Sequence, residues 1–217
     1  IADLKTQVTQ AAIVLTWTAP QRTLTGSTPP VSGYRIYRVE SEPATAVNAE
    51  SPKLKSPLVK IGDSDSPTFQ DTQFEFGKTY AYSARSVTGS GADALESADS
   101  NLTVVTPRDV FPPAAPLGLV IAIVPGQGQT AAHFELSWAV STETDVAGYN
   151  VYRSEQANFA GARLNTDLLL TPAFRDMNVE PGHRYFYTVT AVDRSGNESS
   201  PSEAVSGGVP AESQPNP

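Results

Sequence analysis

The 217-residue sequence contains no cysteine, one methionine and two histidines. The absence of cysteine excludes disulfide bonds, cysteine-ligated zinc and a thiol nucleophile. His133 and His183 lie far apart, neither belongs to an HExxH segment, and no GxSxG segment occurs. A hydrolytic triad needs a base and an orienting acid beside its nucleophile. We therefore expect no catalytic residues, no cofactor and no enzyme activity, and we interpret both histidines as exposed polar residues.

Long hydrophobic runs are also missing. The longest, "LGLVIAIV" at 117–124, is far shorter than the ~20 residues that cross a bilayer. We expect no transmembrane segment. The run is interpreted as a strand that is buried on both sides or covered by a neighbouring loop, with a packed contact between the two halves of the chain as the functional alternative. The sequence starts at Ile1 without a targeting signal, which is typical of an excised fragment or a mature segment.

Positive charge is scarce, and lysine is absent from residues 107–217, where six arginines face twelve acidic residues. Residues 1–106 hold nine Lys and Arg against eleven Asp and Glu, and the whole chain carries a net charge of −8. Such a chain lacks the basic surface that binds phosphate backbones, so nucleic acid is excluded as an expected partner. The acidity is interpreted as a contribution to solubility.

What the sequence does contain is an internal duplication. Four blocks recur in the same order, which indicates a duplicated domain of about 100 residues and not a short solenoid repeat. The pairs are "AIVLTW" (12–17) with "HFELSW" (133–138), "SGYRIYR" (32–38) with "AGYNVYR" (147–153), "SPTFQDTQ" (66–73) with "TPAFRDMN" (171–178), and "FGKTYAYSARSV" (76–87) with "PGHRYFYTVTAV" (181–192).

Most of these blocks show the two-residue period of β-strands. Ile13, Leu15 and Trp17 alternate with other residues, and the second copy repeats this pattern. No segment has a convincing helical period, although 92–98 and 155–162 could hold a short helical turn. The 18 prolines and 15 glycines suit a turn-rich protein. The sequence therefore predicts an all-β chain.

Proline marks the boundary between the copies. "PRDVFPPAAP" at 107–116 contains four prolines and predicts a stiff, extended linker. We expect a first domain at 1–106, a second at 117–209, and a disordered tail at 210–217.

The chain resembles tandem fibronectin type III domains of the bacterial extracellular type. The resemblance rests on the early-strand tryptophan, on Gly-Tyr-x-Val/Ile-Tyr-Arg, and above all on "VEPGHRYFYTVTAVDRSGNESSPSEAV" (179–205). It covers both halves of the chain and is stronger in the second. It implies two tandem seven-stranded antiparallel β-sandwiches of the immunoglobulin-like class.

The resemblance also implies roles for single residues. Trp17 and Trp138 are expected in the cores on strand B. Strand C is expected to carry Tyr34 and Ile36 in the first copy and Tyr149 and Val151 in the second. Tyr80 and Tyr185 are expected to be corner tyrosines, whose hydroxyls bond to backbone near the start of strand F. Phe76 stands where the second copy has Pro181, so the first corner is expected to be looser.

Two acidic clusters could offer oxygen ligands to calcium. They are "GDSDS" (62–66), with Asp63 and Asp65, and "STETD" (141–145), with Glu143 and Asp145. Calcium takes about six to eight oxygens. Because each cluster supplies only two carboxylates, we interpret both as solvated turns and expect no metal site. "DRSGNES" (193–199) predicts a tight turn that uses Gly196 and Asn197.

The largest differences between the copies lie in the loops. From the tryptophan to the strand C tyrosine the first copy runs from 17 to 34 and the second from 138 to 149. The first copy is also longer within 41–58 and at 88–100. In the resembled fold the B–C and F–G loops share one end of the sandwich, and loops carry binding. We therefore hypothesise that 19–33 and 88–100 form a recognition tip and that the second copy is a spacer.

The leading functional hypothesis is a non-catalytic structural, protein-interaction or adhesion module of an exported bacterial protein. It would be periplasmic, secreted or at the cell surface, with a lipid anchor upstream of Ile1 as one arrangement. The alternative is an accessory spacer or carbohydrate-contacting module of a secreted polysaccharide-degrading enzyme, for which Phe111 and Phe159 are the spare aromatic residues. The partner is an unknown protein or glycan, and a monomer is expected.

Overall fold

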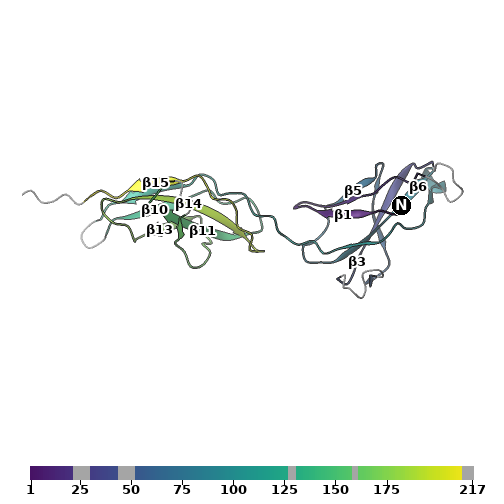
Figure 1. Ribbon diagram of the computed structural model, residues 1–217, viewed down its shortest axis with the longest axis horizontal. Helices are drawn as coiled ribbons and strands as arrows, with labels where there is room; N and C mark the ends of the chain where they lie inside the picture. The colour runs from purple at the N-terminus through teal and green to yellow at the C-terminus, as the bar shows by residue number, and fades with distance from the viewer. Residues whose placement is uncertain (22–29, 44–51, 127–130, 158–160, 212–217) are drawn as a thin grey trace, which may run out of the picture. The chain divides into compact units, whose positions relative to one another are not determined.

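A computed structural model describes residues 1–21, 30–43, 52–126, 131–157 and 161–211. The chain divides into two compact units, Ile1–Asp109 and Val110–Pro217, and both consist of antiparallel strands (Figure 1). Within the described ranges the only helix is the single 3-10 turn Gly91–Asp93, so no helix there is long and apolar enough to cross a membrane. The predicted all-β class of tandem sandwiches is confirmed.

The first unit contains two sheets. One has the order β1-β2-β5, and the other has the order β4-β3-β6-β7 with β8 also paired to β6. The last strand of the sandwich is in two pieces, β7 and β8. The bounds are β1 Lys5–Val8, β2 Ile13–Thr16, β3 Gly33–Glu40, β4 Val59–Ser64, β5 Thr68–Asp71, β6 Tyr80–Thr88, β7 Leu95–Glu96 and β8 Thr103–Val105.

The second unit repeats this arrangement with seven strands. Its sheets have the orders β13-β10-β9 and β12-β11-β14-β15. The bounds are β9 Val120–Val124, β10 His133–Ser137, β11 Val146–Ser154, β12 Ala162–Arg163, β13 Ala173–Asp176, β14 Arg184–Asp193 and β15 Val205–Gly208.

Each unit has its own hydrophobic core, and the two cores share no residue. Trp17 and Trp138 are both buried and pack edge-on against Tyr34 and Tyr149, with ring centroids 5.0 and 5.4 Å apart. The alternating residues face inward because successive side chains of a strand point to opposite faces. The predicted core tryptophans and strand C residues are confirmed.

The corner tyrosines are confirmed as well. The Tyr80 hydroxyl accepts a hydrogen bond from the Glu75 amide at 3.0 Å, and the Tyr185 hydroxyl accepts one from the Glu180 amide at 3.1 Å. Gly77 and Gly182 both have φ of 82° in the preceding turn, a conformation that glycine adopts without steric cost. The first corner is thus built like the second, and the expected loosening at the Phe76 position is not seen.

A charged cluster that the sequence analysis did not anticipate recurs in both sandwiches. In the second unit the buried Asp176 carboxylate accepts hydrogen bonds from Arg153 and from the Tyr187 hydroxyl, each at 2.8 Å. In the first unit Arg38 and Tyr82 bond to Asp71 at 2.6 and 2.8 Å. The arginines also lie over the rings of the corner tyrosines, at 4.7 Å from the centroid in the second unit and 5.0 Å in the first.

Two interpretations of single segments are wrong. His133 is buried, with its Nε2 3.8 Å from the Glu135 carboxylate, whereas His183 is exposed as expected. The run 117–124 is not buried on both sides. Val120 on β9 is exposed, because no described element covers the outer face of the β13-β10-β9 sheet, and Leu117, which precedes the strand, is also exposed.

The segment between the copies is partly packed into the units. Pro107 is fully buried, and its carbonyl accepts a hydrogen bond from Gly77, so this residue belongs to the first unit. The boundaries 107–116 and 117–209 remain predictions. Of the predicted disordered tail, 212–217 lies outside the described residues.

Candidate binding surface

The ends of three loops meet at one end of the first sandwich. They contain residues 32–35, 63–65 and 87–94, and together they line a cavity of about 240 Å³. This is the end at which the loop lengths placed the hypothesised recognition tip, and residues 22–29 of the long B–C loop lie outside the described part of the chain. The prediction that the B–C and F–G loops share one end is confirmed for the described residues.

The cavity wall is rich in hydrogen-bond acceptors and small residues. Ser32 donates to the Gly89 carbonyl at 2.7 Å, and Ser64 donates to the Thr68 carbonyl at 2.7 Å, which fixes both loops. Gly89 and Gly91 have positive φ values of 82° and 64°, so the backbone turns sharply here. The Asp65 carboxylate lies at the exposed rim. Such a site is suited to ligands that donate hydrogen bonds, such as hydroxyl or ammonium groups.

A charged network lies on the sheet next to this cavity. The Glu96 carboxylate accepts hydrogen bonds from Tyr37 at 2.7 Å, from Arg85 at 3.0 Å and from Arg35. The Arg85 guanidinium also lies 4.3 Å from the centroid of the Tyr37 ring and pairs with Asp99 at 2.8 Å. Both arginines are therefore neutralised, and they hold the strand that leads out of the F–G loop against the sheet.

The second unit has a less charged version of this network. Glu198 accepts hydrogen bonds from Tyr152 at 2.7 Å, from Asn150 at 3.0 Å and from Thr190 at 2.5 Å. A tyrosine on strand C and a glutamate after strand F thus recur in both copies, whereas the two arginines occur only in the first. The arginines belong to what distinguishes the first copy.

The Glu96 network gives a pH dependence that can be measured. Hydrogen bonds from Tyr37 and Arg35 lower the pKa of Glu96 from 4.5 to about 2. Because the folded-state pKa is depressed, the charged form contributes stability above about pH 4.5, and this contribution is lost as the pH falls through about 2. We expect Glu96→Gln to destabilise the first unit by about 1 kcal/mol at neutral pH.

Thermal melts of the parent chain and of Glu96→Gln between pH 7 and pH 2 check this expectation. The difference in melting temperature should shrink as the pH approaches 2. Glu42→Gln is the matched control, because the Glu42 carboxylate pairs with an exposed partner, Lys53, at 3.6 Å. A difference for Glu96→Gln that stays constant over the whole range contradicts the assignment.

Both residues of the first acidic pair, Asp63 and Asp65, are exposed and line the cavity. The Asp63 carboxylate forms ion pairs with Lys60 at 2.8 Å and Arg35 at 3.7 Å. The interpretation of this pair as a solvated turn agrees with the position of the two carboxylates.

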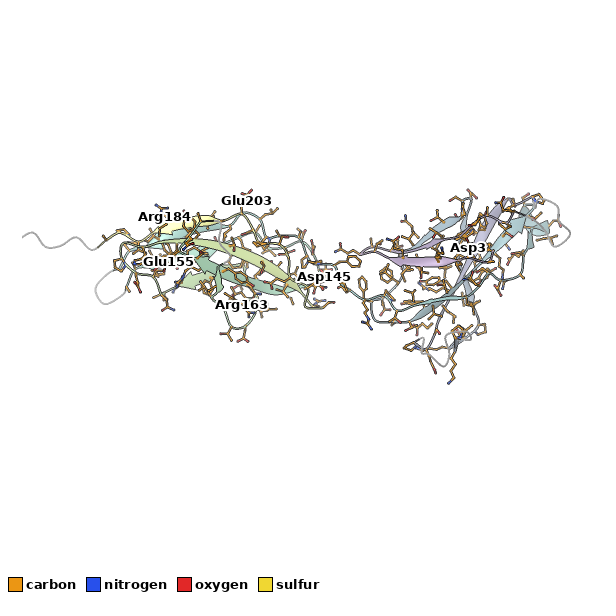
Figure 2. All side chains as sticks on the ribbon, in the orientation of Figure 1. Asp3, Asp145, Glu155, Arg163, Arg184 and Glu203 are labelled. Carbon is orange, nitrogen blue, oxygen red and sulfur yellow. The ribbon has the colours of Figure 1, made fainter. Side chains whose placement is uncertain are left out.

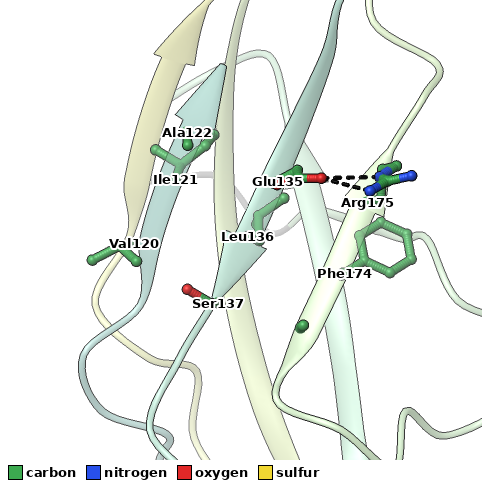
Figure 3. A pocket seen from close by; sticks show the side chains of 9 residues that line it. Val120, Ile121, Ala122, Glu135, Leu136, Ser137, Phe174 and Arg175 are labelled. Atoms are coloured by element: carbon green, nitrogen blue, oxygen red, sulfur yellow. Dashed lines mark hydrogen bonds and ion pairs between the residues drawn. The ribbon is translucent and has the colours of Figure 1, made fainter. Parts of the chain in front are cut away.

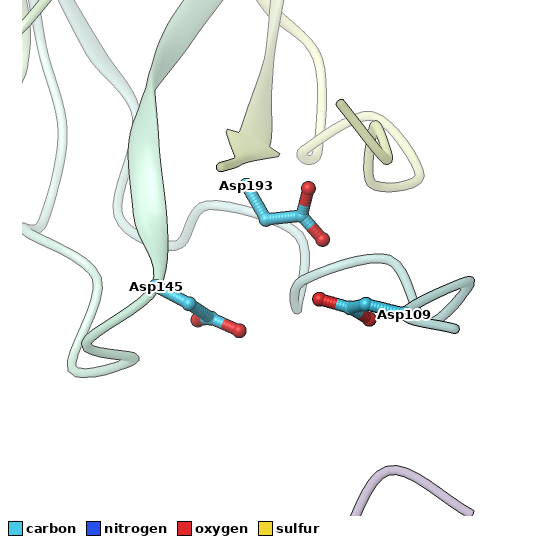
Figure 4. A group of neighbouring side chains, drawn as sticks. All are labelled: Asp109, Asp145 and Asp193. Carbon is cyan, nitrogen blue, oxygen red and sulfur yellow. The ribbon is translucent and has the colours of Figure 1, made fainter. Parts of the chain in front are cut away.

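The second acidic pair also separates. Glu143 accepts a hydrogen bond from the Ala114 amide at 3.1 Å. Asp145 instead lies near Asp193, with a carboxylate oxygen of each within 4.8 Å of the other (Figure 4). Two carboxylates supply at most four of the six to eight oxygens that calcium takes. We assign no metal to this group.

Asp193 already has a structural role in the turn that follows it. Its carboxylate accepts hydrogen bonds from the Ser195 and Asn197 amides, both at 2.8 Å, and Gly196 has φ of 88°. The predicted tight turn at 193–199 is confirmed, with the positive φ at the glycine.

The remaining predicted positions lie elsewhere. Of the long segment 41–58, residues 44–51 are outside the described ranges. Lys55 and Ser56 help to line a second hollow of about 450 Å³ with Arg38, Glu40 and Tyr80. Of the spare aromatic residues, Phe111 is half-buried and Phe159 is not among the described residues.

The second unit has a broad, shallow hollow of its own. It measures about 500 Å³ and lies on the outer face of the β13-β10-β9 sheet (Figure 3). Small side chains line it, among them Ala122, Ser137 and Ala173, and one ion pair joins Arg175 to Glu135 at 2.6 Å. Other charged side chains of this unit, such as Glu155, Arg184 and Glu203, are exposed (Figure 2).

Comparison with known proteins gives relatives of two kinds. No protein-family model matches the chain. Residues covering 92% of the chain are 29% identical to a part of Exoglucanase B from Cellulomonas fimi, and the chain spans 15% of that protein. Residues covering 42% of the chain are 34% identical to a part of the amylopullulanase of Thermoanaerobacterium thermosulfurigenes, of which they cover 4%.

Solved structures show the fold directly. A segment of two fibronectin type III domains from chicken tenascin superposes with a TM-score of 0.50, at 19% identity, over 95% of this chain and 96% of that segment. Both units have the fibronectin type III fold, as the sequence resemblance indicated.

Proposed function

We propose that the chain is a non-catalytic module of an exported bacterial protein that degrades polysaccharides. The observation that supports this proposal is the similarity of 92% of the chain to a small part of an exoglucanase. The similarity to a part of an amylopullulanase, a different enzyme, suggests that this kind of module accompanies more than one enzyme. Such a fold does not itself imply a function, so the role depends on the site.

The proposed contact surface is the end of the first unit that contains the cavity. Its serine hydroxyls, backbone carbonyls and the Asp65 carboxylate are the groups that bond to sugar hydroxyls. The volume of about 240 Å³ is below the ~300–1,000 Å³ of pockets for drug-sized ligands, so it suits one small group at a time. The second unit would act as a spacer.

The second candidate is a protein-interaction or adhesion module at the cell surface. It is favoured by the position of the aromatic residues, since most described tyrosines and both tryptophans lie in the cores and few are exposed for stacking on sugar rings. In this case the same cavity would accept a donor side chain, such as lysine, from a partner protein.

Binding of the 217-residue chain to a glycan array and to insoluble cellulose and starch separates the two candidates. We expect binding to at least one glucan, with no release of reducing sugar. Asp65→Ala, and replacement of residues 88–100 by the shorter 193–202 of the second copy, should each weaken binding at least tenfold. Leu170→Ala is the matched control, because Leu170 is the exposed counterpart of Asp65 in the second unit.

Undiminished binding in the loop replacement overturns the assignment of the surface. A blank array and no binding to either polysaccharide overturn the carbohydrate-contacting role and favour the interaction module.

A further inference from the structure

β9 is an edge strand of its sheet, and one of its two edges has no partner strand among the described residues. It pairs with β10 along all five residues, from Val120 opposite Ser137 to Val124 opposite His133. In the described part of the chain no strand pairs with its other edge. The nearest element there, β15, pairs with β14, and its Gly207 lies against the inward-facing Ile121 side chain.

The residues of this edge are those that favour pairing with another strand. Val120–Val124 is entirely apolar. It contains neither a charged residue nor a proline, and these are the residues with which proteins protect an edge strand. Val120 is 57% exposed and Ile123 is 38% exposed. The equivalent strand of the first unit, Lys5–Val8, carries a lysine and a glutamine and is protected in this way.

The sequence of β9, Val-Ile-Ala-Ile-Val, is also the same in both directions. Two copies of such a strand can pair antiparallel about a twofold axis through Ala122. Val120 then lies opposite Val124, Ile121 opposite Ile123, and Ala122 opposite itself. Every pair except the central one joins two β-branched residues, which are favourable cross-strand neighbours.

The charges beside β9 do not oppose a second copy. The half of the chain from 107 to 217 has a net charge of −6. The face beside β9 carries one balanced ion pair, Glu135 with Arg175 (Figure 3). Pairing at this edge therefore adds no unbalanced charge from these two residues.

We propose that two copies of the chain associate through antiparallel pairing of their β9 edges, which joins two three-stranded sheets into one of six strands. This is an isologous contact, the commonest form in homo-oligomers. It is independent of the proposed binding surface and departs from the expectation of a monomer.

Sedimentation equilibrium of the full chain at increasing concentration tests the proposal. We expect the average mass to rise toward that of a dimer. Ala122→Lys and Ala122→Glu each place two like charges opposite one another across the axis, where directly opposite Cβ atoms are ~4.5–5.5 Å apart. Each variant should weaken association at least tenfold, and an equimolar mixture of the two should restore it, because opposite charges then face each other.

The Ala122 substitutions are not expected to disturb folding, because Ala122 is exposed and a polar residue, Gln7, occupies the equivalent position in the first unit. Circular dichroism and unchanged melting temperatures verify this. Gln7→Lys and Gln7→Glu are the matched controls and should leave association unchanged. A chain that stays monomeric at millimolar concentration overturns the proposal. So does a dimer that neither Ala122 variant weakens, or variants whose mixture fails to associate.

Discussion

Trp138→Ala is expected to lower the melting temperature of the second unit strongly while that of the first stays unchanged. Trp138 is 6% exposed and packs against Tyr149 in a core that shares no residue with the core of the first unit. Truncation of a buried tryptophan costs ~3–5 kcal/mol through lost burial and the cavity left behind. A unit of about 100 residues has a total stability of ~5–15 kcal/mol, so the melting temperature of this unit should fall strongly.

The chain offers a direct readout of this result. It contains two tryptophans, one in each unit. In Trp138→Ala the remaining fluorescence comes from Trp17 and reports the first unit, and in Trp17→Ala the reverse holds. Calorimetry should show one shifted and one unshifted transition in each variant. A single transition that shifts as a whole in both variants contradicts independent units.

Trp138→Phe is the conservative companion of this variant. The Trp138 indole nitrogen is buried and has no hydrogen-bond partner among the described residues. Phenylalanine therefore removes volume without breaking a hydrogen bond, and we expect it to cost less than half as much as alanine. An equal loss in both variants would mean that the indole nitrogen makes a contact that the structure does not show.

The residues that the sequence predicted correctly are those whose role follows from local pattern and from the duplication. Trp17, Trp138 and the corner tyrosines lie in blocks that occur twice, and alternation alone places their side chains on the inner face. The prediction for the run 117–124 was wrong because it also rested on local pattern alone. Its apolar residues predict burial on both faces, but exposure depends on whether another element covers the sheet, and strand content does not determine this.

The acidic residues show a second limit. Asp145 was paired with Glu143 because they are close in sequence, yet the fold places its carboxylate near that of Asp193, which lies 48 positions away. The binding surface was predictable only as a set of long loops. The cavity itself depends on the φ angles of Gly89 and Gly91 and on where residues 63–65 arrive, which follow from tertiary structure.

The buried aspartates were missed although every partner lay within the recurring blocks. Asp71 and Asp176 occupy the same place in "FQDTQ" and "FRDMN", and the arginines and tyrosines that bond to them recur with the same spacing. An aspartate that recurs at a core-facing position of both strands could have indicated these clusters, because a buried carboxylate requires hydrogen-bond or charged partners. These clusters lead to the second large effect.

Asp176→Ala is expected to destabilise the second unit by about 3 kcal/mol. Asp176 is 3% exposed, and its removal leaves the Tyr187 hydroxyl without this acceptor and the Arg153 guanidinium without its counter-charge, although Arg153 still donates to the Asn178 carbonyl at 2.5 Å. Breaking a buried ion pair by removing one partner costs ~3–5 kcal/mol. The Arg153 side chain is 24% exposed, so water partly compensates and the expected value is at the low end.

Asp176→Asn separates charge from hydrogen bonding. The amide keeps one oxygen, which can replace either Oδ2, the acceptor of Tyr187, or Oδ1, which accepts from the Asn178 amide at 2.9 Å, but not both. It loses the negative charge that neutralises Arg153. We expect a loss of about 1–2 kcal/mol, between the parent chain and the alanine variant, because a neutral hydrogen bond contributes less than a charged one.

Urea unfolding of the full chain, followed by fluorescence with Trp17 replaced by phenylalanine, measures the second unit alone. Asp71→Ala in the first unit is the matched variant and should leave this transition unchanged. If Asp176→Ala costs less than ~0.5 kcal/mol, the range of ordinary surface substitutions, the cluster does not stabilise the fold. The recurrence of Arg38, Asp71 and Tyr82 as Arg153, Asp176 and Tyr187 would then need another cause. A large loss in alanine together with a small loss in asparagine would instead assign the cluster mainly to the hydrogen bonds that fix the strand before the corner tyrosine, where both copies make the same turn.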